Sequence, residues 1–192
     1  MSNSLVLQEA LSIPLVINKF AQNDNNKYQE IANLINKKKI KYIVTVARGT
    51  SDCAALYSSY IFAKYLGLPS YSMPPSIITL EKSKFNFSEA LVIVISQSGK
   101  SADLIECEKK SKAMGAITML ISNNKTSPIV SSANYFLDMF AGEEKSVAAT
   151  KTFFAQLLSF YGLAIKFAQI KANQSPDEIG KLINELLKLP PL

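Results

Sequence analysis

Apolar and polar positions along this chain are grouped in blocks that predict strands and helices in turn. Short runs of β-branched and other apolar residues are typical of strands buried on both faces, and each is followed by a segment with apolar residues at helical spacing. Strands are expected at 40–47, 69–73, 90–95, 116–121 and 135–140. Helices are expected at 54–65, at 74–80, at 102–114, from Pro128, and at 147–172. This alternation predicts an α/β fold with a five-stranded parallel sheet covered by helices on both faces.

Further helical segments flank the alternating region. Residues 5–20, interrupted by Pro14, are expected to form an amino-terminal arm of one or two helices, and 28–35 a further helix. Near the carboxyl end, Ser175 and Pro176 have the residue types of a helix start, and two prolines before Leu192 are typical of a linker. The expected organisation is an arm at 1–36, an α/β domain at 37–174, and at 175–192 a helix followed by the start of a linker.

Polar loops follow three of the expected strands, at 48–52, 96–101 and 141–146. The carboxyl ends of parallel strands lie at the same edge of a sheet, and ligands of such sheets bind outside that edge. We therefore expect the three loops to meet around one ligand.

The loop at 96–101 carries the strongest chemical signal. Ser96, Ser98 and Ser101 supply hydroxyl donors, Gln97 supplies an amide, and Gly99 allows close approach of the backbone to a ligand. A helix is expected directly afterwards, so its free N–H groups and positive dipole end face the same point. A phosphate or another small anion is the expected ligand. The structural alternative for Ser101 is a plain helix N-cap.

The loop at 48–52 carries a weaker signal. Gly49, Thr50 and Ser51 lie between a strand and a helix, as in many ordinary helix starts. The alternative is that Thr50 and Ser51 contact sugar hydroxyls or a carbonyl oxygen. Arg48 could equally pair with an anionic ligand or form a structural salt bridge.

In the third segment, Glu144 and Lys151 are candidates for polar contacts with the ligand. Glu144 is the candidate carboxylate base for proton transfer, because the chain has no histidine. The alternative is that these residues cap the start of the long helix, where a carboxylate complements the positive dipole end.

Composition narrows the class of protein. The chain has 192 residues, of which 48% are hydrophobic and 19% charged, enough to bury a core without disulfides or metal. Cys53 and Cys107 have neither metal-ligand spacing nor a histidine partner, so we expect buried free thiols, no metal and no cofactor.

Charge and hydropathy indicate the compartment. The net charge is +6, and its densest run, Lys37–Lys39, fits a solvated helix end better than a nucleic-acid surface because Arg48 is the only arginine. The chain shows no signal-peptide pattern, and its apolar runs are strand-length. We expect a cytoplasmic protein that contacts neither nucleic acid nor membrane.

Three segments together resemble the sugar isomerase (SIS) domain family. The segments are Ala47–Asp52, Ile95–Gly99, and Ala141-Gly142 with Glu144 and Val147–Lys151. The resemblance is greatest to the first SIS domain in the isomerase half of glucosamine-fructose-6-phosphate aminotransferase and to isomerase-like glucosamine-6-phosphate deaminases. It implies a flavodoxin-like three-layer αβα sandwich that binds a phosphosugar.

The resemblance also implies roles for individual residues. The serine loop would hold the phosphate, and Thr50 and Ser51 would contact the sugar, beside Val147 and Ala149. The complete set of implied binding residues is Gly49, Thr50, Ser51, Ser96, Gln97, Ser98, Gly99, Ser101, Val147, Ala149 and Lys151. Lys100 stands where the family usually has Glu, which reverses a charge near the phosphate.

Two functions remain open at this point. One is a half-enzyme of amino-sugar phosphate metabolism, with isomerase or deaminase chemistry on a hexose 6-phosphate. The other is a non-catalytic phosphosugar-binding or regulatory module, or the product of a split or truncated gene. Enzymes of the family carry two such domains, and their ring-opening residues come largely from the second domain or a neighbouring subunit; no position here matches them.

A lone domain would also leave apolar surface uncovered on the arm and on the helix at 147–172. We therefore expect a homodimer, or a separately encoded second SIS domain as partner. A flavin- or nucleotide-binding protein is disfavoured because the glycine-rich dinucleotide and Walker patterns are missing.

Overall fold

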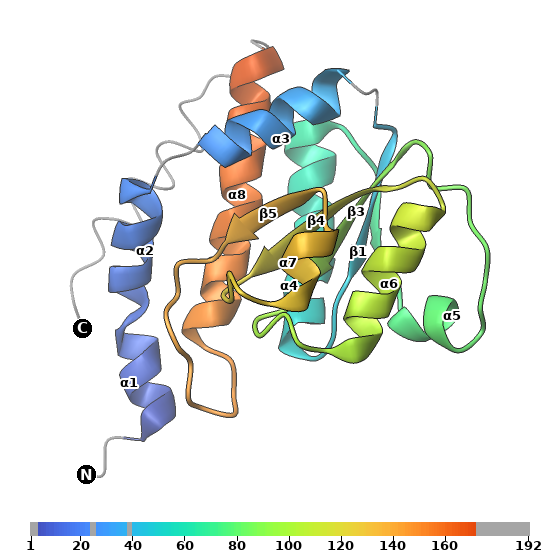
Figure 1. Cartoon of the computed structure of the whole chain (residues 1–192). Helices are drawn as coiled ribbons and strands as arrows, with labels where there is room; N and C mark the ends of the chain where they lie inside the picture. Colours follow the sequence, from blue (N-terminus) through green and yellow to red (C-terminus); the bar gives the residue numbers. More distant parts are fainter. Residues whose placement is uncertain (1–3, 24–25, 38–39, 172–192) are drawn as a thin grey trace.

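Five parallel strands form the centre of the domain. The computed structural model describes residues 4–23, 26–37 and 40–171. The strands are β1 (Tyr42–Val46), β2 (Ser70–Ser72), β3 (Ala90–Ile95), β4 (Ile117–Ser122) and β5 (Tyr135–Asp138). Their order across the sheet is β2-β1-β3-β4-β5, and every pairing is parallel (Figure 1). The predicted parallel sheet is confirmed, and β3 has the predicted bounds.

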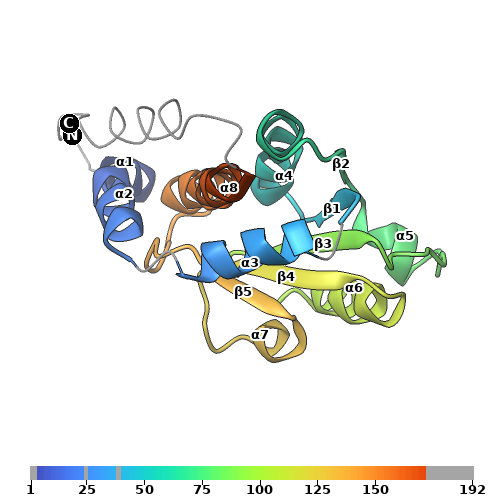
Figure 2. The same cartoon turned by 90° about the horizontal axis from the view of Figure 1, so that it is seen from above.

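Helices cover both faces of this sheet. On one face lie α3 (Asn26–Lys37), α4 (Thr50–Ile61) with its π-helical continuation η1 (Phe62–Leu66), and α8 (Lys151–Lys171). On the other lie α5 (Pro75–Thr79), α6 (Ala102–Ala113) and α7 (Pro128–Ser132) (Figure 2). The result is the expected three-layer αβα sandwich with a flavodoxin-like strand order.

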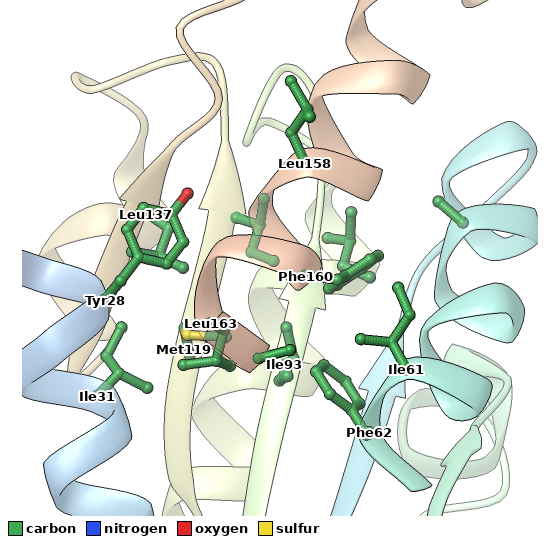
Figure 3. Packing of buried hydrophobic residues seen from close by; sticks show 14 of the residues in the cluster. Tyr28, Ile31, Ile61, Phe62, Ile93, Met119, Leu137, Leu158, Phe160 and Leu163 are labelled. Carbon is green, nitrogen blue, oxygen red and sulfur yellow. The ribbon is translucent and has the colours of Figure 1, made fainter. Parts of the chain in front are cut away.

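Alternating strand residues build two separate cores. In β3, Leu91, Ile93 and Ile95 pack under α8, whereas Val92 and Val94 face the opposite layer. A strand buried on both faces has to be apolar at every position, which explains its unbroken apolar run. On the α8 side, the rings of Phe62 and Phe160 meet edge to face at 5.6 Å between centroids (Figure 3).

The amino-terminal arm consists of two helices, α1 (Leu5–Leu11) and α2 (Ile13–Gln22), with Pro14 in the first turn of α2. Proline fits a first turn because its missing N–H has no partner there. Phe20 of α2 and Tyr28 of α3 pack against Gly162 of α8. A Cβ at Gly162 would lie 2.8 Å from Phe20 and 3.0 Å from Tyr28, so only glycine permits this close approach.

The long carboxyl-terminal helix differs from prediction in its start and its exposure. It begins at Lys151 rather than at 147, because residues 141–149 lie in an irregular loop whose Glu144 caps the first amides of the helix. It leaves no large apolar side chain exposed within the described residues, so the predicted uncovered face on this helix is wrong.

The expectation that apolar runs reach only strand length is wrong for this helix. Lys151–Ile170 is long and apolar enough to cross a bilayer by composition, with a mean hydropathy of 1.3. However, 56% of this stretch is buried inside the domain, against α2, α3 and α4. Burial of this kind identifies a core helix of an α/β domain.

Exposed apolar side chains gather instead on the arm and on α4. Those of the arm are Leu5, Val6, Leu7, Leu11 and Leu15, and those of α4 are Leu56, Tyr57 and Tyr60. Cys107 is buried as expected, but Cys53 is exposed, because it lies on the outer side of the first turn of α4. The predicted helix and linker at 175–192, and Lys38 and Lys39 of the basic run, lie outside the described residues.

Candidate functional site at the carboxyl edge of the sheet

The polar loops predicted to meet all follow strands at one edge of the sheet (Figure 1). The strand order adds a second reason to place a ligand there. The chain leaves β1 toward β2 and leaves β3 toward β4, in opposite directions across the sheet. Open α/β sheets bind their ligands outside the carboxyl ends of the strands at such a switch point.

An ion pair crosses this switch point. Arg48, directly after β1, pairs through Nε with the carboxylate of Asp103 in the first turn of α6. The structural salt bridge considered for Arg48 is therefore present. It also balances the negative charge of Asp103, which would otherwise repel an anion from the start of α6. Lys100, three residues before Asp103 in the chain, is exposed and adds positive charge to the serine loop.

The serine loop (residues 96–101) turns sharply at Gly99, which has φ of +63°. The Gly99 N–H donates to Ser96 Oγ at 3.1 Å, and the Lys100 N–H donates to Ser98 Oγ at 3.3 Å. A hydroxyl that accepts a hydrogen bond keeps its own proton for donation. Ser101 occupies the N-cap of α6, but its side chain makes no capping bond. Ser98 and Ser101 are half-buried, and Ser96 is buried. The three hydroxyls lie just before the positive end of a twelve-residue helix.

The loop after β4 holds the serine loop in place. The Asn123 N–H donates to the Gln97 carbonyl at 3.1 Å, and Asn124 Nδ2 donates to the Ser98 carbonyl at 3.0 Å. Ser127 packs directly against Gly99, where a Cβ would lie 2.5 Å from the serine Cβ. These contacts fix the backbone of the loop from behind and leave its outer face to a ligand.

The loop after β1 contributes the start of α4. Gly49 has φ of +56° and ψ of −134°, a conformation that residues with a side chain avoid. Ser51 Oγ accepts a hydrogen bond from Gln156 Nε2 of α8 at 2.9 Å, so its proton is available to a ligand, and Thr50 is exposed. Gln156 Oε1 is buried without a partner among the described residues.

The β5–α8 loop (residues 139–150) closes the third side. Asn123 bridges it to the serine loop, because its Oδ1 accepts the Ala141 N–H at 3.1 Å and its Nδ2 donates to the Gly142 carbonyl. At the far end of the loop, Val147 is fully exposed and Ala149 is half-buried.

Glu144 lies in this loop with both carboxylate oxygens engaged. Oε1 accepts the Thr150 N–H at 2.9 Å, the Thr150 hydroxyl at 3.0 Å and the Thr152 N–H at 3.2 Å, and Oε2 accepts the Thr152 hydroxyl. These are the contacts of the helix cap that stood as the alternative to a catalytic role.

Lys151, the first residue of α8, points into the loop rather than into solvent. Its Nζ donates to the Glu143 carbonyl at 2.5 Å and lies 3.8 Å from a carboxylate oxygen of Glu9. Its side chain is 11% exposed.

Several residues at this edge were not singled out from the sequence. Asn123 and Asn124 belong to none of the three predicted polar loops, although they follow a strand at the same edge of the sheet. Glu9 stands far from any motif in the sequence, and Gln156 lies five residues beyond the last one, Val147–Lys151. A glutamine within a strongly apolar helix was the available signal for Gln156, and no local pattern points to Glu9.

Fold and edge together define an open α/β domain with a hydroxyl-bearing loop at the switch point of its sheet. The chain belongs to the SIS domain family, whose model matches residues 34–166. A glutamine–fructose-6-phosphate aminotransferase (isomerizing) from Methanosarcina mazei is 34% identical over 157 residues, which are 80% of this chain and 25% of the relative. The corresponding enzyme from Clostridium tetani is 31% identical over 185 residues, which are 96% of this chain and 30% of that enzyme.

Solved structures show the same relationship. A chain from Silicibacter pomeroyi, provisionally named a phosphosugar isomerase, has a TM-score of 0.85 at 28% identity, over 96% of this chain and 56% of its own. The C-terminal domain of glucosamine-fructose-6-phosphate aminotransferase from Francisella tularensis has a TM-score of 0.81 at 29% identity, over 95% and 52%. The chain thus spans about half of these structures and less than a third of the curated relatives.

Proposed function

We propose that this chain binds a phosphorylated sugar at the carboxyl edge of its sheet. The phosphate lies in the serine loop, against Ser96, Ser98 and Ser101, and the sugar lies between the start of α4 and the β5–α8 loop. The observation that carries the proposal is the set of hydroxyl donors at the start of α6, beside the switch point of the sheet. The names of the related proteins, which act on hexose 6-phosphates or are described as phosphosugar isomerases, agree with this ligand class.

The wider role follows from what the chain lacks. Aldose–ketose isomerisation or deamination requires a base that moves a proton between C1 and C2, and the chain has no histidine. Glu144 is the candidate base on this chain, but its oxygens accept four hydrogen bonds from Thr150 and Thr152. We therefore favour half of an amino-sugar phosphate isomerase or deaminase, completed by a second SIS domain. The second candidate is a binding module without turnover, favoured by the same engagement of Glu144.

The partner is proposed to be a second copy of this chain or a separately encoded SIS domain, in a soluble, cytoplasmic assembly. The exposed apolar side chains of α4 and the arm supply the surface for it. Light scattering at micromolar concentration tests the homodimer directly. A monomer there would contradict the homodimer.

Isothermal titration calorimetry tests the ligand. Glucosamine 6-phosphate and fructose 6-phosphate should bind, and unphosphorylated glucosamine should not. Combined Ser96→Ala, Ser98→Ala and Ser101→Ala should weaken binding by more than about tenfold, since each lost bond to a charged group is worth about 1.5–3 kcal/mol. Ser131→Ala is the matched control, because that exposed hydroxyl bonds only a carbonyl of its own helix, α7.

Hexose phosphates that release no heat with the wild-type protein, or a triple variant that binds as well as the wild type, would contradict the proposed ligand. Incubation of the same protein with glucosamine 6-phosphate separates the two roles. Turnover would establish an enzyme, whereas binding without turnover would favour the module.

A further inference from the structure

The arm helix α1 docks through a carboxylate rather than through apolar side chains. Glu9 is the only buried residue of α1, whereas Leu5, Leu7 and Leu11 of the same helix are exposed. A charged side chain is seldom buried unless it has specific partners. The partners of Glu9 therefore define what α1 does in this domain.

Those partners all lie in the β5–α8 loop or at its end. Glu9 Oε1 accepts the Lys145 N–H at 2.6 Å, and Oε2 accepts the Ser146 N–H at 3.1 Å together with the Ser146 hydroxyl. Lys151 Nζ stands 3.8 Å from Oε1. In Figure 1 the orange loop runs beside α1, more than 130 residues away in the sequence. One carboxylate thus holds two backbone amides, a hydroxyl and an ammonium group of this loop.

The electrostatics agree with a charged, engaged carboxylate. Hydrogen bonds from Ser146 and Lys145 hold the pKa of Glu9 below its ordinary value, and the Lys151 charge acts in the same direction. Glu9 therefore keeps the negative charge that accepts these hydrogen bonds to a lower pH than an ordinary glutamate does.

We propose that Glu9 is a positioning residue that holds the β5–α8 loop in the shape that receives the sugar, so that α1 is part of the binding site. This inference rests on the proposed function, and it assigns α1 to binding of the sugar rather than of the phosphate. Preorganisation is the physical reason: a loop that is already fixed loses less conformational freedom when a ligand binds.

The serine loop is held by residues other than Glu9, so the two loops can be tested separately. Its backbone is held by Asn123, Asn124 and Ser127, and none of these contacts involves Glu9. Loss of the Glu9 carboxylate should therefore weaken recognition of the sugar and leave recognition of phosphate alone intact.

The test compares two probes, glucosamine 6-phosphate and inorganic phosphate, by calorimetry on the full chain. Glu9→Gln should raise the Kd for glucosamine 6-phosphate by about tenfold and change the Kd for inorganic phosphate by less than about twofold. Glu30→Gln is the matched control. Glu30 is an exposed residue of α3 whose carboxylate, among the described residues, forms an ion pair only with Lys27 of the same helix, so it does not hold the β5–α8 loop. It should bind both probes as the wild type does.

Hydrogen exchange provides a second readout without ligand. In Glu9→Gln the amides of 143–149 should exchange faster, and those of 96–101 should not change. If Glu9→Gln does not fold, Ser146→Ala removes one donor to the same carboxylate and should shift both readouts in the same direction.

The outcomes separate the two claims. Wild-type protein that binds neither probe would overturn the proposed function, and the sugar-binding role of Glu9 with it. Wild-type protein that binds both, together with a Glu9→Gln variant that has unchanged affinities, would overturn the role of Glu9 alone. A variant that loses affinity for both probes equally would also overturn it, because Glu9 would then support the whole domain.

Discussion

Arg48 Nε forms an ion pair with the Asp103 carboxylate, and this pair joins the loop after β1 to the first turn of α6. The two residues are 55 positions apart in the sequence. Their charges meet where the proposed phosphate binds, so their removal should have opposite effects on affinity.

Arg48→Gln should weaken binding of glucosamine 6-phosphate by several-fold, because it leaves the Asp103 carboxylate uncompensated at the start of α6. Asp103→Asn should strengthen binding, because it releases the guanidinium toward the ligand. The Arg48 side chain is 63% exposed, so solvent screens the effect, and raising the salt concentration should reduce it. Calorimetry at two ionic strengths provides the measurement. Equal affinities for the two variants would show that the pair lies too far from the ligand to act on it.

Gly99 should tolerate no side chain. Gly99→Ala forces a positive φ on alanine and places its Cβ against Ser127. We therefore expect the free energy of unfolding to fall by about 2–4 kcal/mol. Phosphate binding should be lost as well. Gly142→Ala is the control for strain alone, because Gly142 has φ of +68° with nothing within 4 Å of its Cβ position. The free energy of unfolding of Gly142→Ala should fall by only about 1 kcal/mol. Urea unfolding of both variants tests the difference, and equal losses would rule out the contact with Ser127 as its cause.

Glu144→Gln tests the helix cap at the start of α8. The substitution removes the charge and one of the acceptors used by Thr150 and Thr152, so Tm should fall by about 2–6 °C. Glu143→Gln, one position earlier and exposed, should leave Tm within about 1 °C. Differential scanning fluorimetry provides both values. If the chain is found to turn over a hexose phosphate, the same Glu144→Gln protein decides whether this carboxylate is also the base.

The two cysteines should react at very different rates. Burial raises the pKa of the Cys107 thiol to about 11, with a smaller contribution from Asp103 and Glu106, and its Sγ donates to the Pro75 carbonyl. At pH 8 only about one Cys107 in a thousand is then a thiolate, the reactive form. Native protein treated with iodoacetamide should therefore be labelled at Cys53 first, and at Cys107 only in denaturant. Rapid double labelling of the native protein would contradict this burial.

The carboxyl edge of the sheet shows how much of a structure local sequence patterns can predict. The backbone of the serine loop is as predicted, because a strand end, a glycine turn and a helix start are all recorded in neighbouring residues. The supporting contacts were not predicted. Asn123 contacts both Gln97 and Gly142, and such a bridge exists only once β3, β4 and β5 lie side by side.

The start of α8 shows where local patterns mislead. Val147 to Ala149 are acceptable helix residues by propensity, and the helix was expected to include them. In the structure, Glu144 caps the chain at Thr150 and Glu9 holds Lys145 and Ser146 away from helical geometry. Tertiary hydrogen bonds to charged groups outweigh a propensity difference of a few tenths of a kcal/mol per residue.

The order of apolar blocks determined by itself that this chain forms a five-stranded parallel sheet between helices, with a hydroxyl-rich loop at one edge. Hydrophobic periodicity and turn chemistry are local properties, and each is written within a few neighbouring residues. Only the tertiary structure decided which face of α8 is covered, which cysteine is exposed, and that Glu9 of the arm holds the loop before α8. Those outcomes depend on contacts between distant segments, whose partners no single stretch of sequence specifies.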